Sequence, residues 1–220
     1  TDASGTLDRG NWSGVMVYLS NNHVIGGTAA AARNVLSGND RDRGAAIVGA
    51  ASSGGVGNTV HGNLIGTDIN GSFGIAGDGA GVHVNADVQD GNWIGGPGPG
   101  QGNVVFGGVY LERGPHTLVQ GNLVGTNATG TAGVGSVGQG VNGSRDAHSC
   151  TIGGTQPGAG NVISGNSQRG VFVRGPGWVV QGNLIGVRAD GVSPLGNGED
   201  GLEVVADAGG MAELVEHERS

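Results

Sequence analysis

The sequence contains no lysine, a single cysteine and few aromatic residues, and each shortage excludes a kind of chemistry or fold. Without lysine, the chain cannot form a Schiff base or use a lysine nucleophile. Cys150 has no partner for a disulfide within the chain. Aromatic residues make up only 4% of the composition, so large rings cannot be the main support of a core. The net charge of −8 disfavours contact with a phosphate backbone, so we expect no nucleic-acid partner.

Glycine is the abundant residue instead, at 51 of 220 positions. The glycines do not follow the repeat of collagen, and a hydrophobic content of 36% with only 6 prolines argues against a disordered chain. The sequence also lacks an apolar run of about 18 residues, the minimum for a membrane-spanning helix, so we expect no membrane insertion. A regular β architecture with tight turns fits this composition best.

Short phrases recur along the chain about every 60 residues. The phrase GNLIGT begins at Gly62 and returns in closely similar form at Gly121 and Gly182. A second phrase, RNVLSGN in its first copy, and a third that ends in IGG follow the same period. Such recurrence is typical of repeat architectures in which one structural unit stacks on the next.

A finer repeat consists of a glycine followed by residues that alternate between apolar and other types, as in strands. It begins at Gly14, Gly44, Gly81, Gly108, Gly140, Gly170 and Gly201. The sequence therefore predicts an all-β fold, a right-handed parallel β-helix of about six coils of about 31 residues, with two unlike coils in each longer repeat. Asparagines in the phrases should stack as two ladders at bends, Asn63, Asn122 and Asn183 in one and Asn34, Asn103 and Asn161 in the other.

The phrases GNLIGTD at 62–68 and IGGTQPGAGNVISGN at 152–166 resemble the right-handed parallel β-helix repeat proteins of bacterial surfaces and secretions. These proteins share their fold with pectate lyases and alginate epimerases. The resemblance covers residues 1–205, which we assign to the β-helix, and it implies a secreted or cell-surface location in a bacterium. Residues 206–220 match no repeat, and we expect either a cap on the stack or a segment foreign to the native gene. Both a monomer and a piece of a longer solenoid remain open.

Residues that lie between the inward-facing apolar positions should form columns on the outside of the coils. The first expected column is Met16, Ala46, His83, Tyr110, Asn142, Phe172 and Glu203. The second, two residues further along each strand, is Tyr18, Val48, Asn85, Glu112, Ser144, Arg174 and Val205.

These columns contain the candidate site. We assign His83 and Tyr110 as base and acid and Glu112 as a second carboxylate, all three as catalytic candidates. Arg174 would anchor a uronate carboxylate, since guanidinium groups bind carboxylates well. The other substrate-binding candidates are Phe172 and Asn85. The resemblance implies that a substrate lies along the outside of the coils; the alternative is an ordinary mixed β face exposed to solvent.

The loop that follows GNLIGT is rich in oxygen ligands and leaves calcium open at Asp68, although the complete EF-hand pattern is missing. We expect no required cofactor. Two functions follow. One is a secreted protein that binds or acts on extracellular polysaccharide or a cell-surface glycan, with a lean towards a lyase or glycoside hydrolase. The other is a non-catalytic adhesin or stalk segment of a longer solenoid.

Overall fold

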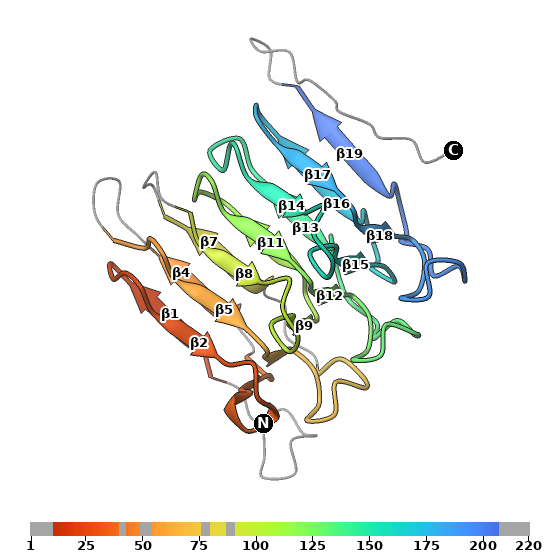
Figure 1. Cartoon of the computed structure of the whole chain (residues 1–220), viewed down its shortest axis with the longest axis horizontal. Helices are drawn as coiled ribbons and strands as arrows, with labels where there is room; N and C mark the ends of the chain where they lie inside the picture. Colours follow the sequence, from red (N-terminus) through yellow and green to blue (C-terminus); the bar gives the residue numbers. More distant parts are fainter. Residues whose placement is uncertain (1–10, 40–42, 49–53, 76–79, 87–90, 207–220) are drawn as a thin grey trace.

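The computed structural model describes residues 11–39, 43–48, 54–75, 80–86 and 91–206 (Figure 1). Apart from Ala206, the tail predicted at 206–220 lies outside the described residues. The described part of the chain contains 19 strands, all in three parallel sheets, and one 3-10 turn, η1 (Ala30–Ala32). No helix among these residues is long and apolar enough to cross a membrane.

Sheet A has seven strands: β1 (Ser13–Tyr18), β4 (Arg43–Val48), β7 (Ala80–Asn85), β10 (Val109–Leu111), β13 (Val141–Gly143), β16 (Val171–Arg174) and β19 (Leu202–Val205). Sheet B has six: β2 (Val24–Gly26), β5 (Thr59–His61), β8 (Trp93–Gly95), β11 (Leu118–Gln120), β14 (Thr151–Gly153) and β17 (Val179–Gln181). Sheet C also has six: β3 (Val35–Leu36), β6 (Leu64–Ile65), β9 (Val104–Val105), β12 (Leu123–Val124), β15 (Val162–Ile163) and β18 (Leu184–Ile185).

The chain visits sheets A, B and C in turn and then returns to sheet A, so the neighbours in each sheet are three strands apart in sequence. This order confirms the all-β prediction and is consistent with a parallel β-helix solenoid. The register of sheet A follows the first predicted outer column, from Met16 opposite Ala46 through His83, Tyr110 and onward to Glu203.

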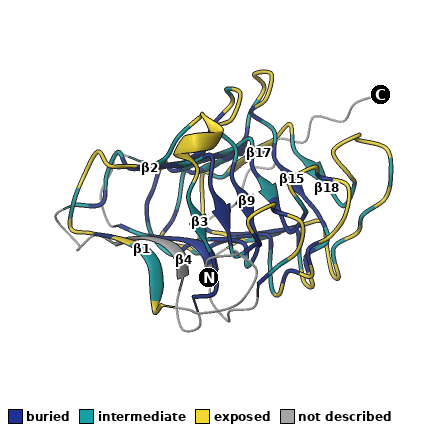
Figure 2. Cartoon of the chain, turned by 90° about the horizontal axis from the view of Figure 1, so that it is seen from below, coloured by how far each residue is buried: buried dark blue, intermediate teal, exposed yellow. Residues whose placement is uncertain are grey.

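Small aliphatic side chains fill the inside of the stack. Val60, Ile94, Val119 and Ile152 follow one another in sheet B, and each is 0% exposed. Figure 2 shows buried residues mainly along the strands and exposed ones mainly in the loops. Cys150 belongs to this core, and its burial raises the pKa of the thiol to about 12. The thiol is therefore a packing group rather than a nucleophile.

The glycine that ends each strand of the IGG phrase is required by the close approach of neighbouring coils. At Gly153 the backbone has φ +88°, and a Cβ atom would lie 2.0 Å from the carbonyl oxygen of Gln181 in the next coil. Gly95 has φ +81° and would place a Cβ atom 2.1 Å from the carbonyl oxygen of Gln120. Only glycine combines this backbone conformation with this spacing.

The asparagines of the two repeated phrases form one ladder, which corrects the prediction of two. Each Nδ2 donates to the Oδ1 of the asparagine in the next coil, at 2.8 to 3.2 Å, in the order Asn34, Asn63, Asn103, Asn122, Asn161 and Asn183. The prediction failed because the 60-residue repeat spans two coils, and both phrases occupy the same corner of successive coils. The ladder therefore runs through every described coil at this corner.

Each member also fixes the backbone around it. The Nδ2 of Asn122 donates to the carbonyl oxygen of Ile94 at 2.8 Å, and its Oδ1 accepts the backbone N–H of Asn103 at 3.1 Å. These partners are buried, so the side chain satisfies backbone groups that water cannot reach.

We expect Asn122→Ala to lower the free energy of unfolding by about 3 kcal/mol, because it leaves at least one buried donor and one buried acceptor without partners. The measurement is chemical denaturation followed by circular dichroism. Asn183→Ala is the matched control, since Asn183 is the last member of the ladder and is partly exposed to water. Its cost should be less than half as large; equal costs for the two variants would contradict the role assigned to the ladder.

Candidate functional site

Three side chains predicted for the site meet on the outer face of sheet A. His83 and Asn85 lie two residues apart on β7 and so point to the same side, and Glu112 directly follows the neighbouring strand β10. The Nε2 of His83 lies 2.8 Å from the Oε2 of Glu112, and the Nδ2 of Asn85 donates to the same oxygen at 3.0 Å. The carboxylate is thereby held in one orientation.

Tyr110 completes this group. It pairs with His83 in the register of sheet A, and the two rings stack with centroids 5.0 Å apart and planes inclined by 7°. The backbone of Glu112 is fixed as well, because its N–H donates to the carbonyl oxygen of Val84 and its own carbonyl accepts a hydrogen bond from the Ser144 hydroxyl. We call His83, Asn85, Tyr110 and Glu112 the carboxylate cluster.

Exposure differs sharply within the carboxylate cluster. The side chain of His83 is 1% exposed, whereas that of Glu112 is 38% exposed and Tyr110 is half-buried. The side chains of His83 and Asn85 both bind the Oε2 of Glu112, and the Glu112 side chain still reaches solvent. The groups that a ligand could touch first are therefore the Glu112 carboxylate and the edge of the Tyr110 ring, with His83 behind them.

Phe172 and Arg174 form a separate group. They lie on β16, with strand β13 between them and the carboxylate cluster, so parallel-strand spacing places them about 10 Å from it. Phe172 is 8% exposed, and the guanidinium of Arg174 lies 4.8 Å from the centroid of its ring. The ring is therefore engaged by a cation, and the structure does not bring these two candidates together with Glu112.

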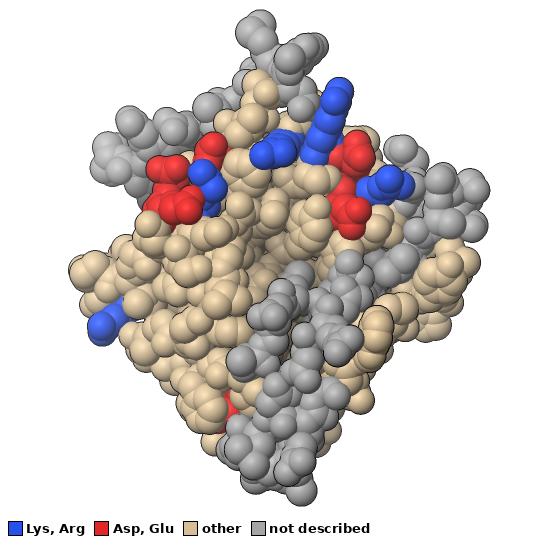
Figure 3. All heavy atoms as spheres, turned by 180° about the vertical axis from the view of Figure 1, so that it is seen from behind, with Lys and Arg blue, Asp and Glu red and all other residues tan. Residues whose placement is uncertain are grey.

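Arg169 is the residue of this group that the sequence did not reveal. Its guanidinium lies 5.2 Å from the centre of the Phe172 ring and forms ion pairs with Glu199, at 2.8 Å, and with Glu203. Arg169 is in the turn before β16 and so outside the alternating columns, and no motif marks it. On the face shown in Figure 3, the described charges gather in groups of mixed sign rather than along a track of one sign.

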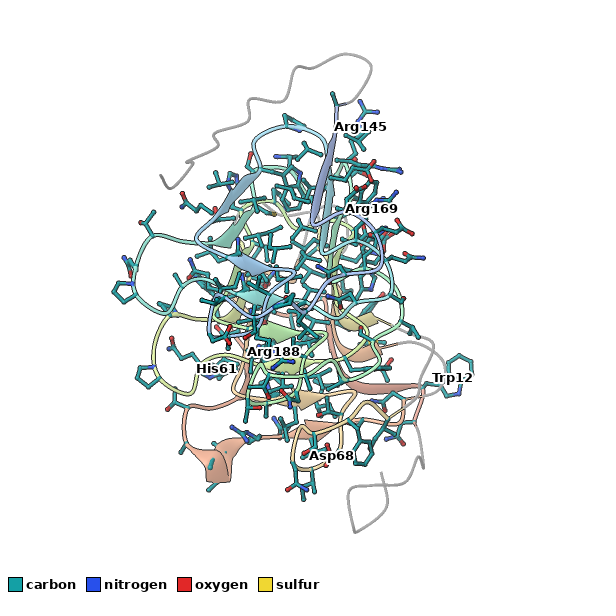
Figure 4. The ribbon with its side chains drawn as sticks, turned by 90° about the vertical axis from the view of Figure 1, so that its right-hand side faces the viewer. Trp12, His61, Asp68, Arg145, Arg169 and Arg188 are labelled. Atoms are coloured by element: carbon teal, nitrogen blue, oxygen red, sulfur yellow. The ribbon has the colours of Figure 1, made fainter. Side chains whose placement is uncertain are left out.

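Asp68 lies in a hairpin loop after β6, at the end of the stack away from Arg169 (Figure 4). Its buried carboxylate accepts the backbone N–H groups of Asn70, Ser72 and Phe73. Burial by itself would raise the pKa of Asp68, but these hydrogen bonds outweigh it and hold the pKa below its ordinary value. The carboxylate thus stabilises the turn.

Two further hairpin loops are closed in the same way as the Asp68 loop. Isolated antiparallel bridges close all three, at Thr67–Gly74, Thr126–Gly133 and Val187–Pro194. In the second loop, the amide oxygen of Asn127 takes the place of the Asp68 carboxylate. In the third loop this task moves two residues along to Asp190, whose bonds from the hydroxyl and amide of Ser193 and the amide of Val192 lower its pKa to about 2.

Metal binding has no additional support from the geometry. Within the described ranges, no three His, Cys, Asp or Glu side chains gather closely enough to hold a metal ion. Calcium binding at Asp68 remains a prediction, and it would require an ion to compete with the three backbone amides for the carboxylate oxygens.

Comparison with known proteins identifies no relative: no protein-family profile, no curated protein and no solved structure matches the chain. The base, acid and substrate-binding roles assigned within the outer columns therefore remain predictions.

We expect acid to destabilise the hairpin loops, because a carboxylate whose pKa is lowered by folding stabilises the folded state above the ordinary pKa. That contribution is lost as the pH falls from about 4 towards 2. Asp68→Asn, the residue that the second loop uses naturally at Asn127, keeps an acceptor that does not titrate. Thermal unfolding between pH 7 and pH 2 should show a smaller fall in Tm for the variant than for the unchanged chain.

Asp146→Asn serves as a control, because Asp146 is an exposed aspartate outside the hairpin loops. Its acid response should match that of the unchanged chain. An unaltered response in Asp68→Asn would show that the Asp68 carboxylate does not contribute to acid sensitivity.

Proposed function

We propose that the chain is a secreted or surface-attached bacterial protein, a right-handed β-helix of about six coils that binds extracellular polysaccharide on the outer face of sheet A. The observation that carries the proposal is the carboxylate cluster. A half-exposed carboxylate is held by His83 and Asn85 beside the ring of Tyr110. No resident cofactor enters this proposal, and calcium is treated as a variable to be tested.

The carboxylate cluster suits a sugar for two physical reasons. The partly exposed carboxylate of Glu112 can accept hydrogen bonds from sugar hydroxyls, and the ring of Tyr110 offers an apolar surface with a hydroxyl at its tip. Because Oε2 is already bound by two side chains, the carboxylate loses little rotational freedom when a ligand arrives. The carboxylate of Glu112 is therefore preorganised to accept hydrogen bonds from a ligand.

If the bound polymer is cleaved, Glu112 is the residue placed to take or deliver the proton, and His83 would act by orienting its carboxylate. His83 is 1% exposed, so a direct contact between its ring and a polymer is less well supported than a contact with Glu112. This division of roles would serve a lyase or a hydrolase, with Tyr110 as the second proton-transfer group.

The second candidate function is a non-catalytic adhesin or stalk segment. Its specific support is that side chains of the outer columns contact one another. His83 stacks on Tyr110, and Phe172 is held by Arg174 and is only 8% exposed. Such contacts between neighbouring coils stiffen a solenoid without any ligand.

The test is binding of the purified chain to a panel of polyuronates and neutral glycans, with and without calcium, by isothermal titration calorimetry. Glu112→Gln and Tyr110→Leu should each weaken the affinity for the bound glycan by about tenfold, the loss expected for one charge-assisted hydrogen bond or one stacking contact. Tyr18→Leu is the matched control. Tyr18 is 63% exposed on the same face but lies at the N-terminal edge of sheet A.

The same samples should be assayed for new reducing ends and unsaturated products. Binding with cleavage that is lost in Glu112→Gln would establish an enzyme, and binding without cleavage would favour the adhesin. If no glycan of the panel binds, or if Tyr18→Leu weakens binding as strongly as Tyr110→Leu, the carboxylate cluster is not the site.

A further inference from the structure

The outer face of sheet B carries an exposed tryptophan within a column of uncharged side chains. In the inner coils of the stack, the register places four outward positions in line: Thr59, Trp93, Leu118 and Thr151. Trp93 is 44% exposed, and the other three are half-buried. Figure 1 shows the strands of sheet B side by side, so this column crosses the strands and runs along the stack.

A second column lies beside the first, two residues further along each strand. It alternates between glycine and a longer polar side chain, in the order Gly26, His61, Gly95, Gln120, Gly153 and Gln181. The alternation follows the 60-residue repeat, because each glycine belongs to an IGG phrase and each polar residue directly precedes a GNL phrase. Equivalent polar side chains are therefore two coils apart, which is about 10 Å.

Neither column of sheet B contains a carboxylate or a guanidinium group. In this respect the face differs from the outer face of sheet A, which carries Glu112 and Arg174. The polar groups on sheet B are imidazole, amide and hydroxyl groups, and the Nε2 of Gln120 is held by the carbonyl oxygen of Gly153 at 2.9 Å. A ligand with many charges would lose water here without gaining an ion pair, so the face favours a neutral ligand.

An exposed indole ring beside hydrogen-bonding side chains suits a sugar. The faces of a sugar ring consist of C–H groups, whereas its hydroxyls lie around the rim. A sugar stacked on Trp93 would cover the apolar ring and would bring its rim over the second column, where His61 and Gln120 lie one coil before and one coil after. The two columns thus match the apolar face and the polar rim of the same ligand.

The alternation of the second column matches a polymer rather than a single sugar. In a flat β-1,4-linked glucan or mannan, each sugar is turned over relative to the one before, so equivalent hydroxyls recur at every second sugar. One strand spacing, about 4.8 Å, is close to the length of one sugar in such a chain. The repeat of two sugars therefore matches the repeat of two coils that separates His61 from Gln120.

We propose that the outer face of sheet B binds a neutral β-1,4-linked glucan or mannan that lies along the stack, across the strands. Trp93 stacks on one sugar, and His61 and Gln120 bind hydroxyls of the sugars on either side. The inference goes beyond the function proposed for sheet A, because it assigns a second face and a neutral ligand, and it does not depend on the carboxylate cluster.

The test is isothermal titration calorimetry of the full chain with cellohexaose and with mannohexaose. Trp93→Leu should weaken the affinity for the bound hexamer by about tenfold, the loss expected for one aromatic stacking contact. Gln120→Ala, which removes one amide, should weaken it by about threefold. Circular dichroism of each variant should match that of the unchanged chain before its affinity is compared.

Trp12→Leu is the matched control, because Trp12 is 72% exposed but directly precedes β1 of sheet A. It should leave the affinity for the hexamer unchanged, and an equal loss in Trp12→Leu and Trp93→Leu would overturn the inference. Failure of the unchanged chain to bind either hexamer would overturn it as well.

Two further outcomes would assign the face differently. Weaker hexamer binding in Tyr110→Leu, together with full binding in Trp93→Leu, would place the neutral glycan on sheet A; it would contradict this inference and leave the function proposed for sheet A intact. If the unchanged chain sediments as a dimer that Trp93→Leu converts to a monomer, a second copy covers the face, and the inference is wrong.

Discussion

The structure depends on the hydrogen bonds that join each coil to the next. Parallel strands bond their backbone N–H and C=O groups to the strands of the neighbouring coils. At the corner between sheets B and C, the ladder from Asn34 to Asn183 bonds backbone groups that no strand reaches. Since these bonds fix the register, they also decide which side chains become neighbours. Both the small aliphatic core and the outer columns follow from that single constraint.

The carboxylate cluster shows how the register of sheet A brings polar side chains from different coils together. His83 and Glu112 are 29 positions apart in the sequence, and they meet because that separation is close to one coil. Asn85 joins them from the same strand as His83. A site on such a scaffold is held by sheets rather than by loops, which favours a preorganised contact with a long polymer over a deep pocket for a small molecule.

The same constraint makes the ends of the stack different from its middle. Among the described residues, apolar side chains of the first and last coils, such as Val15 and Ile185, are only partly buried, whereas those of the coils between are mostly buried. Repeat proteins generally require a cap at such places, and exposed strand edges invite pairing with another chain.

The sequence by itself determined the parallel sheets, the order of the outer column from Met16 to Glu203 and the meeting of His83 with Glu112, because periodicity fixes which residues share a position in successive coils. It could not determine the single ladder, since two phrases in one long repeat look like two separate series. Only the tertiary structure decided that His83 and Phe172 are covered and that Arg169 reaches Phe172. Exposure depends on what turns and neighbouring side chains place over a strand, and those contacts leave no period in the sequence.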